Sequence, residues 1–112
     1  NPFIVWGSGG QARGFTYISD LVEGMIMAME KSNDVNPINL GTDKATPIKE
    51  LAELILKLTR HNIPITFEKS KPEGVSSRKT DVSKAKKILE WKQKTELETG
   101  LKRTIDWYLN EC

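Results

Sequence analysis

The chain has 112 residues, which is the size of one small domain or of part of one. Apolar residues make up 38% of it and the net charge is +2, which argues against a disordered chain and against nucleic acid as a partner. Its one cysteine, Cys112, excludes an internal disulfide, and no apolar run approaches the roughly 20 residues of a membrane span. We expect a cytoplasmic protein with no membrane partner.

The first forty residues predict a strand, a loop, a second strand, a helix and a third strand. The apolar run Phe3–Trp6 is typical of a strand, and the glycine-rich segment Gly7–Gly10 predicts a tight loop. The β-branched and aromatic residues of Phe15–Ile18 predict the second strand. Ser19 is the expected N-cap of a helix that ends near residues 32–33, and Pro37–Leu40 is the expected third strand. The buried face of that helix is predicted to contain Leu21, Val22, Met25, Ile26, Ala28 and Met29.

The middle of the chain predicts a helix, a strand and a long loop. Thr46 is the expected N-cap and Pro47 the first residue of a helix whose apolar stripe runs over residues 48–58. Residues 63–67 are the expected strand. The polar segment 68–80 contains proline and glycine and predicts a loop.

Two helices are predicted at the end of the chain. Asp81 is the expected N-cap of a helix over residues 82–89, and Trp91, which follows it, is expected to serve packing. Thr95 and Glu98 have the spacing of a capping box, in which Thr95 is the cap of the last helix. The predicted buried face of that helix contains Leu97, Leu101, Ile105, Tyr108 and Leu109.

This order of elements favours an α/β fold rather than a helix bundle. We expect a small sheet of short strands packed by about four helices. The strands are few, so the sheet is expected to be completed by sequence outside the chain. The chain starts without Met and reaches a strand-like run within three residues, and we expect it to be a piece of a longer polypeptide.

Side chains with a catalytic pattern are scarce. The one histidine, His61, lies at an expected helix end and fits a helix cap or a surface residue better than a general base. No serine has the partners of a Ser-His-Asp triad, and no pair of carboxylates has a setting that would separate their pKa values. The Gly7–Gly10 loop leads into a predicted strand and lacks a following Lys-Ser/Thr, so it is neither a P-loop nor a dinucleotide fingerprint.

Two arginines are the strongest candidates for ligand binding. Arg13 precedes a predicted strand, and Arg78 lies in the polar loop just before an expected N-cap. The planar guanidinium fork suits phosphate oxygens, so the two residues could clamp a diphosphate, although each could also be plain surface charge. The lysines between Lys69 and Lys94 are mostly expected on solvated surface.

Several short segments together resemble the extended short-chain dehydrogenase/reductase family. Residues 7–22, GSGGQARGFTYISDLV, are similar to the family pattern G-x-G-x-Q-x-R-D-F-x-Y-V-x-D-L-V. Asn39-Leu40-Gly41 resembles the N-x-G that follows in the family, and residues 46–52 resemble its next helix start. The matches continue in the same order at residues 71–74, 78, 81–85, 89–91 and 97–101. Gly14 stands where Asp is common, Glu90 where Gly is usual and Gln93 where Pro is usual.

The resemblance implies a Rossmann-type enzyme that epimerises, dehydrates, decarboxylates or reduces a sugar nucleotide with NAD or NADP. Its catalytic Tyr-x-x-x-Lys pair is not found here, since neither Tyr17 nor Tyr108 has Lys four positions later. Residues 1–112 are therefore expected to be the C-terminal region that binds the nucleoside-diphosphate sugar. The Rossmann domain and its cofactor are expected outside the chain, and the chain alone is expected to be inactive. We expect the parent enzyme to be a homodimer and the separated chain to self-associate.

The resemblance also implies roles for individual residues. Arg13 and Arg78 match arginines that contact the phosphates or the ribose of the nucleotide. Trp6 and Gln11 match positions near the nucleotide, although Trp6 could equally be a core residue. Lys71 begins a K-P-x-G stretch similar to that of GDP-fucose synthases, where the neighbouring loop approaches the nucleotide. Asp20 and Asp81 are expected to have structural roles at helix starts.

Two other functions remain open from the sequence. The chain could be a freestanding small binding or regulatory domain derived from the family, or a structural or interaction domain whose arginines are only surface charge. The nucleobase, the sugar, the reaction subtype and the choice between NAD and NADP are not specified by these residues.

Overall fold

The computed structural model describes residues 1–33 and 35–112, and over these residues the chain forms four helices and five strands. In chain order they are β1 (Phe3–Trp6), β2 (Ala12–Arg13), α1 (Ile18–Lys31), β3 (Thr46–Pro47), α2 (Ile48–Thr59), β4 (Ile65–Glu68), β5 (Ser77–Arg78), α3 (Ser83–Leu89) and α4 (Leu97–Glu111). The predicted α/β class, with short strands and four helices, is confirmed.

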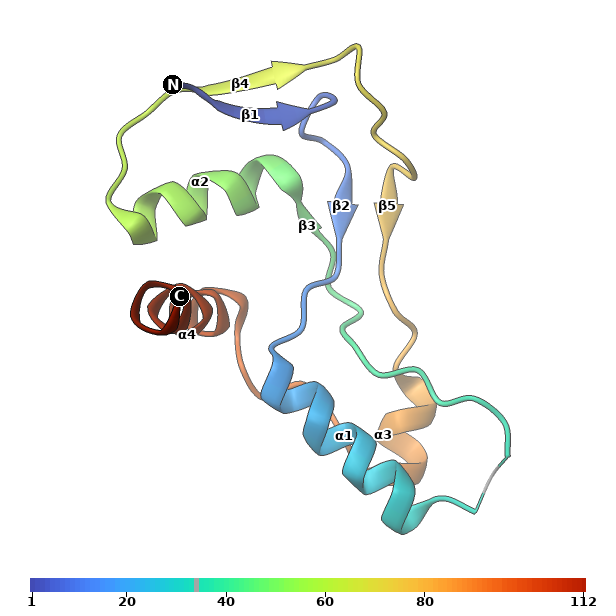
Figure 1. Ribbon diagram of the computed structural model, residues 1–112. Coiled ribbons are helices and arrows are strands. Elements are labelled where there is room, and N and C mark those ends of the chain that lie inside the picture. Colours follow the sequence, from blue (N-terminus) through green and yellow to red (C-terminus); the bar gives the residue numbers. More distant parts are fainter. Residues whose placement is uncertain (34) are drawn as a thin grey trace.

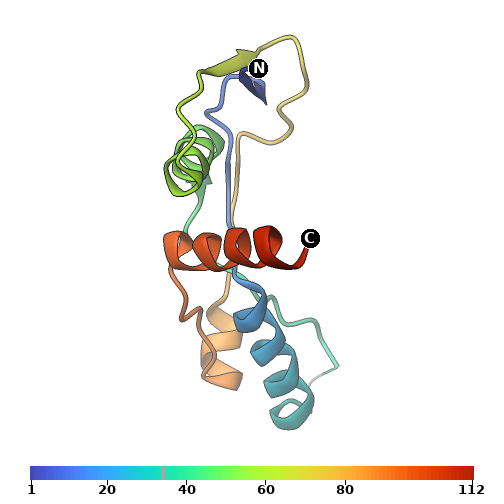
Figure 2. The same cartoon turned by 60° about the vertical axis from the view of Figure 1, so that its left-hand side comes forward.

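The molecule is elongated, with extents of 51, 33 and 19 Å. Its radius of gyration is 16.5 Å, against about 13 Å for a compact domain of 100 residues. One end contains β1, β4 and α2, the other contains α1 and α3, and β2 and β5 run between them (Figure 1). Helix α4 crosses the molecule between the two ends (Figure 2). Each of the four described helices therefore has several exposed residues.

The strands form two small sheets rather than the single sheet that the sequence predicts. In the first, β1 and β4 are parallel, with Phe3 opposite Ile65 and Trp6 opposite Glu68. In the second, β2 is central and pairs antiparallel with β3 and parallel with β5. This second sheet thus combines strands from three separate parts of the chain, with β2 between the other two.

Two predicted strands are wrong. Phe15–Tyr17 has no strand partner and leads directly into α1, while the strand lies earlier, at Ala12–Arg13. The aromatic residues of this segment are half-buried. A high β propensity mainly reflects packing on a half-buried surface, and these residues pack in that way without pairing in a sheet. Pro37–Leu40 is also irregular, and its Ile38 and Leu40 pack against the core cluster instead. The loop predicted over residues 68–80 contains β5.

Helix α1 ends where predicted, but its start and its buried face differ from the prediction. It begins at Ile18, so Ser19 lies inside the helix and Tyr17 is at the N-cap without a side-chain hydrogen bond. Asp20 and Gly24 are its buried residues, because Leu40 and Trp91 pack against the bare backbone of Gly24. The large apolar side chains exposed on α1 are Ile18, Val22, Met25, Ile26 and Met29.

Helix α2 begins one residue later than predicted. Thr46 and Pro47 form β3, and the helix starts at Ile48 with no side-chain cap. Its first free amides are satisfied from afar: the Ile48 N–H donates to the Gln11 carbonyl and the Lys49 N–H to the Gly9 carbonyl, both at 2.9 Å. These bonds replace the predicted threonine cap and fix the helix start against the glycine loop.

The predicted caps of α3 and α4 are also wrong in detail. Val82 occupies the N-cap of α3, although the Asp81 carboxylate accepts the Ser83 N–H at 3.0 Å. Glu96 occupies the N-cap of α4 without a side-chain cap bond, so no capping box forms. The Thr95 N–H donates instead to the Asp20 carboxylate at 2.9 Å. A distant side chain therefore takes the amide that the local motif was expected to use.

The far end of α4 is more exposed than predicted. Leu97, Leu101 and Ile105 are half-buried, as expected for the face near α2. Tyr108 and Leu109 are 62% and 67% exposed, because the C-terminal end of α4 projects past the rest of the described chain (Figure 2). At 15 residues, α4 is the longest helix in the described part of the chain, and none there is long and apolar enough to cross a membrane.

The buried hydrophobic cluster of the described residues lies around α3. Val82, Ala85, Leu89 and Trp91 form the buried cluster, which confirms Trp91 as a packing residue. Partly buried residues complete the cluster: Met27, Ala28, Ile38 and Leu40.

Asp20 connects α1 to the segment before α4. It is 3% exposed, and its carboxylate accepts the N–H groups of Lys94 and Thr95. Its carbonyl accepts the indole N–H of Trp91 at 2.9 Å. The predicted structural role of Asp20 is therefore confirmed, although it acts through tertiary contacts as well as through its place at a helix start.

Candidate functional site

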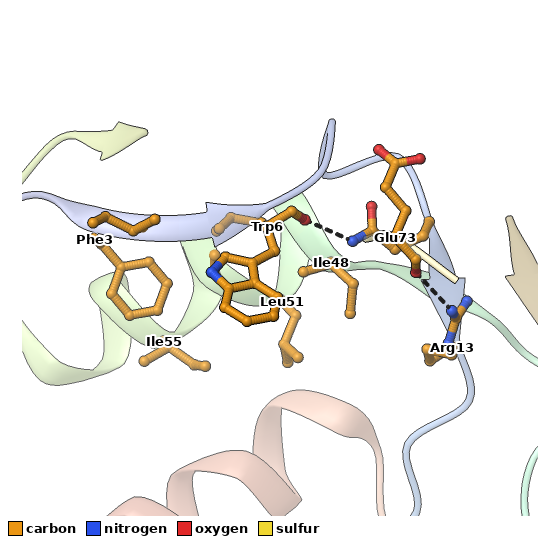
Figure 3. A pocket seen from close by; sticks show the side chains of 11 residues that line it. Phe3, Trp6, Arg13, Ile48, Leu51, Ile55 and Glu73 are labelled. Atoms are coloured by element: carbon orange, nitrogen blue, oxygen red, sulfur yellow. Dashed lines mark hydrogen bonds between the residues drawn. The ribbon is translucent and has the colours of Figure 1, made fainter. Parts of the chain in front are cut away.

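A pocket of about 430 Å³ lies between β1 and α2 (Figure 3). Residues 3–6 of β1 form one wall, and the α2 side chains of Ile48, Leu51 and Ile55 form the other. Arg13 and Glu73 lie at the end near β2 (Figure 3), and Gln11, which directly precedes β2, also lines the pocket. The pocket is thus an apolar cleft with its polar groups gathered at one end, which is the general form of a small-molecule site.

Trp6 offers an open aromatic face to this pocket. It is 56% exposed, so the interpretation of Trp6 as a core residue is wrong. The ammonium group of Lys71 lies over its ring, 5.6 Å from the centroid. A ring with this exposure can stack on a nucleobase or hold a cation.

Gln11 is buried at the polar end with one acceptor unused. Its side chain is 9% exposed, and its Nε2 donates to the Trp6 carbonyl at 3.0 Å. Within the described part of the chain, Gln11 Oε1 has no hydrogen-bond partner. A buried acceptor without a partner is costly, and a ligand N–H or O–H group would satisfy it.

Arg13 lies beside Gln11 on β2 and is half-buried. Its Nη1 donates to the Ala12 carbonyl at 2.8 Å, and its Nη2 donates to the Glu73 carbonyl at 3.3 Å. Both acceptors are neutral carbonyl groups, so the positive charge of the guanidinium is not neutralised by these bonds. The residue can therefore attract an anion at this end of the pocket.

Arg78 is the partner of Arg13 across the β2–β5 pairing, and the Gly14 N–H donates to the Arg78 carbonyl at 3.0 Å. Partners at one register position have side chains on the same face of a sheet. The backbones of the two arginines therefore lie side by side, although the residues come from distant parts of the sequence. Arg78 is exposed and lies outside the lining of the pocket, as does Lys71.

Glu73 is the site residue that sequence reasoning missed. Its carboxylate accepts the Ser8 N–H, and its carbonyl accepts Arg13. Hydrogen bonding with the Ser8 side chain, and then with the Ser8 backbone N–H, lowers the pKa of the Glu73 carboxyl. The K-P-E-G stretch points to Lys71, and no local pattern in the sequence indicates that Glu73 contacts the glycine loop.

The glycine loop does not fit a dinucleotide. Gly7 and Gly9 have φ angles of +84° and +80°, and the loop leads into β2 rather than into a helix. The helix whose N-terminus lies against this loop is α2, and its Ile48 and Lys49 N–H groups are already bonded to the Gln11 and Gly9 carbonyls. They are therefore not the free amides that hold a pyrophosphate in a Rossmann site. His61 follows the C-terminal end of α2, as expected, and its N–H donates to the Leu56 carbonyl. The described residues hold no group of three or more metal-ligating side chains.

Comparison with known proteins gives a consistent family. Residues 1–104 match the family model described as GDP-mannose 4,6 dehydratase. The chain is 38% identical to UDP-glucuronic acid decarboxylase 1 of Arabidopsis thaliana, over 98% of this chain and 25% of that protein. It is 36% identical to GDP-mannose 3,5-epimerase of the same plant, over 94% of this chain and 27% of that protein.

A solved structure is similar over the whole chain. It is UDP-glucuronic acid 4-epimerase from Bacillus cereus in complex with UDP-glucuronic acid and NAD, with a TM-score of 0.86 and 27% identity. The match covers 100% of this chain and 36% of that one. The chain thus spans between a quarter and little more than a third of these relatives. On the family match and this fold, the chain belongs to the extended short-chain dehydrogenase/reductase family of nucleotide-sugar epimerases and dehydratases, and it resembles GDP-mannose dehydratase.

Proposed function

We propose that the pocket between β1 and α2 binds the nucleoside-diphosphate part of a sugar nucleotide. The observation that carries this proposal is the pairing of Arg13 with Arg78 next to a pocket that contains Trp6 and Gln11. Relatives are named for UDP- and GDP-linked sugars, which supports a ligand with a nucleobase and a diphosphate. Residues 1–112 would then be the substrate-binding region of an NAD(P)-dependent epimerase, dehydratase, decarboxylase or reductase.

Each side chain has a distinct task in this proposal. The exposed face of Trp6 stacks on the base, which is a contact open to any base. The free Oε1 of Gln11 accepts a hydrogen bond from the base or the ribose. Arg13 and Arg78 donate to phosphate oxygens, where paired guanidinium groups bind more strongly than neutral donors. Lys71 adds positive charge beside Trp6.

The chemical step is expected to lie outside these residues. NAD or NADP would bind to a Rossmann domain in another part of the polypeptide, since the glycine loop here does not fit a dinucleotide. The parent protein is expected to be a cytoplasmic homodimer. The purified chain of 112 residues should not convert any sugar nucleotide when NAD or NADP is added. Turnover by this chain would contradict the proposal that the catalytic residues lie outside it.

Calorimetric titration tests the binding site. UDP-, GDP- and dTDP-sugars would be titrated into the whole polypeptide that contains residues 1–112. Arg13→Gln and Arg78→Gln should each weaken binding by about tenfold to a hundredfold, because each removes a charge-assisted contact. Arg60→Gln is the matched control, since Arg60 is exposed at the end of α2 and is not among the residues that line the pocket. Equal affinity in all four proteins, or no saturable binding at all, would refute the proposal.

A further inference from the structure

The segment between β4 and β5, residues 69–76, crosses the glycine loop and the end of β1. We call these residues the strap. The strap leaves β4 in a turn in which the Lys71 N–H donates to the Glu68 carbonyl at 3.0 Å. It then passes the polar end of the pocket on its way to β5 (Figures 1 and 3). The Ala12 N–H donates to the Ser76 carbonyl at the end of the strap, and three further contacts are made by Lys71 and Glu73.

The first contact is made by the Glu73 carboxylate. It accepts the Ser8 N–H, and the Glu73 side chain lies directly against the backbone of Gly7. A side chain at position 7 would overlap the Glu73 carboxyl group, and Gly7 has a φ of +84°. The bare glycine backbone therefore lets an anionic oxygen reach a main-chain amide next to Trp6.

The other two contacts involve groups of the candidate site. The Glu73 carbonyl accepts Arg13 Nη2 at 3.3 Å. The Lys71 ammonium lies over the Trp6 ring at 5.6 Å. The strap thus presents a carboxylate to an amide, a carbonyl to a guanidinium and a cation to an aromatic face, all within three residues of its length.

We propose that the strap is a gate that occupies the nucleotide site with its own groups, and that Glu73 is the anion that a diphosphate displaces. This inference rests on the proposed function, because it concerns the same pocket. In the closed state the strap takes one donor of Arg13 and holds the Lys71 ammonium over the Trp6 ring, and the Glu73 carboxylate repels the phosphates of an incoming ligand. The apparent dissociation constant then exceeds the intrinsic one by the inverse of the open fraction. We call the contact between the Glu73 carboxylate and the Ser8 N–H the latch. A change that weakens the latch should therefore tighten ligand binding.

Removal of the Glu73 charge is the direct test. In the whole polypeptide, Glu73→Gln should bind UDP or GDP about threefold more tightly, a modest gain because exposed ionic contacts are weak. Glu68→Gln is the matched control: it removes a carboxylate at the start of the strap whose backbone, rather than its side chain, contacts the loop. The control should bind like the parent protein.

The latch itself can be observed without measuring affinity. The Ser8 amide resonance should shift as Glu73 is protonated, with a midpoint below the ordinary carboxyl pKa of 4.5. Glu73→Gln should abolish this shift. Saturating UDP or GDP should also abolish it in the parent protein, because the displaced carboxylate no longer contacts Ser8.

The possible outcomes distinguish a failure of the gate proposal from a failure of the proposed nucleotide site. Binding that depends on Arg13 but is unchanged or weakened in Glu73→Gln would overturn the gate and leave the proposed function intact. A Ser8 shift that persists in the saturated complex would also overturn it. If no variant, Glu73→Gln included, shows saturable binding, the proposed function and the gate both fail.

Discussion

Arg13 and Arg78 are Cα partners in the parallel pairing of β2 with β5, and the amide after Arg13 donates to the carbonyl of Arg78. The two residues come from different halves of the chain, and each of their strands has only two residues. Their proximity therefore depends on the strand pairing and not on any local sequence. It places two permanent positive charges at adjacent positions of one small sheet, which is the physical basis of the proposed diphosphate site.

The adjacency of the two arginines predicts that their contributions to binding are coupled. In a double-mutant cycle, Arg13→Gln with Arg78→Gln should depart from additivity by about 0.5–3 kcal/mol, the range found for residues that share a partner. Titration of UDP or GDP into the four proteins gives the coupling energy. Strict additivity would indicate that the arginines do not contact the same phosphate group.

Asp20 should be important for stability. Asp20→Ala leaves the N–H groups of Lys94 and Thr95 without their buried acceptor, which typically costs about 1–3 kcal/mol. Urea unfolding followed by circular dichroism measures the loss. The control is Glu23→Gln, which removes a carboxylate from the exposed ion pair with Lys94 and should change the stability little. Similar losses in both variants would argue against the role of the buried contacts.

The two neighbouring apolar residues Ile88 and Leu89 should differ sharply in their effect on folding. Leu89 is fully buried in the α3 cluster, and Leu89→Ala should cost about 2–5 kcal/mol. Ile88 is 39% exposed on the same helix, so Ile88→Ala should cost much less. Leu89→Val provides a milder change if the alanine variant does not fold. Unfolding curves in which Ile88→Ala is the more damaging variant would contradict the assigned core.

The start of α3 should contribute a pH-dependent part of the stability. The Asp81 carboxylate accepts the Ser83 hydroxyl at 2.6 Å and the Ser83 N–H at 3.0 Å, and these bonds lower the pKa of Asp81 from its ordinary value of 3.8. Because the pKa is lower in the folded chain, the contribution is present above 3.8 and is lost as the pH falls through the lowered value.

Asp81→Asn should therefore lower the melting temperature at neutral pH, and the difference from the parent should shrink in acid. Thermal unfolding over a pH series checks this. Ser83→Ala, which removes the hydroxyl and keeps the acid, should show the same trend. A melting-temperature gap that stays constant down to a pH well below 3.8 would contradict the assignment.

The exposed apolar side chains of α1 should make the separated chain self-associate. They are Ile18, Val22, Met25, Ile26 and Met29. A patch of this kind favours contact with another apolar surface in water. Sedimentation velocity should show association that rises with concentration, and the pair of changes Met25→Lys and Met29→Lys should reduce it. Lys86→Met, elsewhere on an exposed helix surface, should not reduce it.

The helices were the part of the fold that the sequence predicted well. The four of them lie close to their predicted positions because helical hydrogen bonds are local, so the apolar spacing of α2 or the end of α1 is visible in a short window. The strands β1 and β4 were also found, since each has four residues. Strands β2, β3 and β5 have two residues each, too few for a period, and they exist because distant segments pair.

The helix caps show the same difference between what local sequence predicts and what distant contacts decide. Thr46, Thr95 and Ser19 have the chemistry of caps, but none of them takes that role. The amides at the start of α2 bond to the carbonyls of the glycine loop, and the amides before α4 bond to Asp20. In both places, tertiary partners occupy the amides that the local side chains were predicted to cap.

By itself, the sequence determined the helical framework, the small-sheet α/β class and the family, because each is encoded in short stretches of consecutive residues. Only the tertiary structure decided that Arg13 lies beside Arg78, that Trp6 is exposed at a pocket, and that Glu73 contacts Ser8. These relationships join residues that are far apart along the polymer. Their free energy comes from strand pairing and close packing, and neither leaves a periodic signal in the sequence.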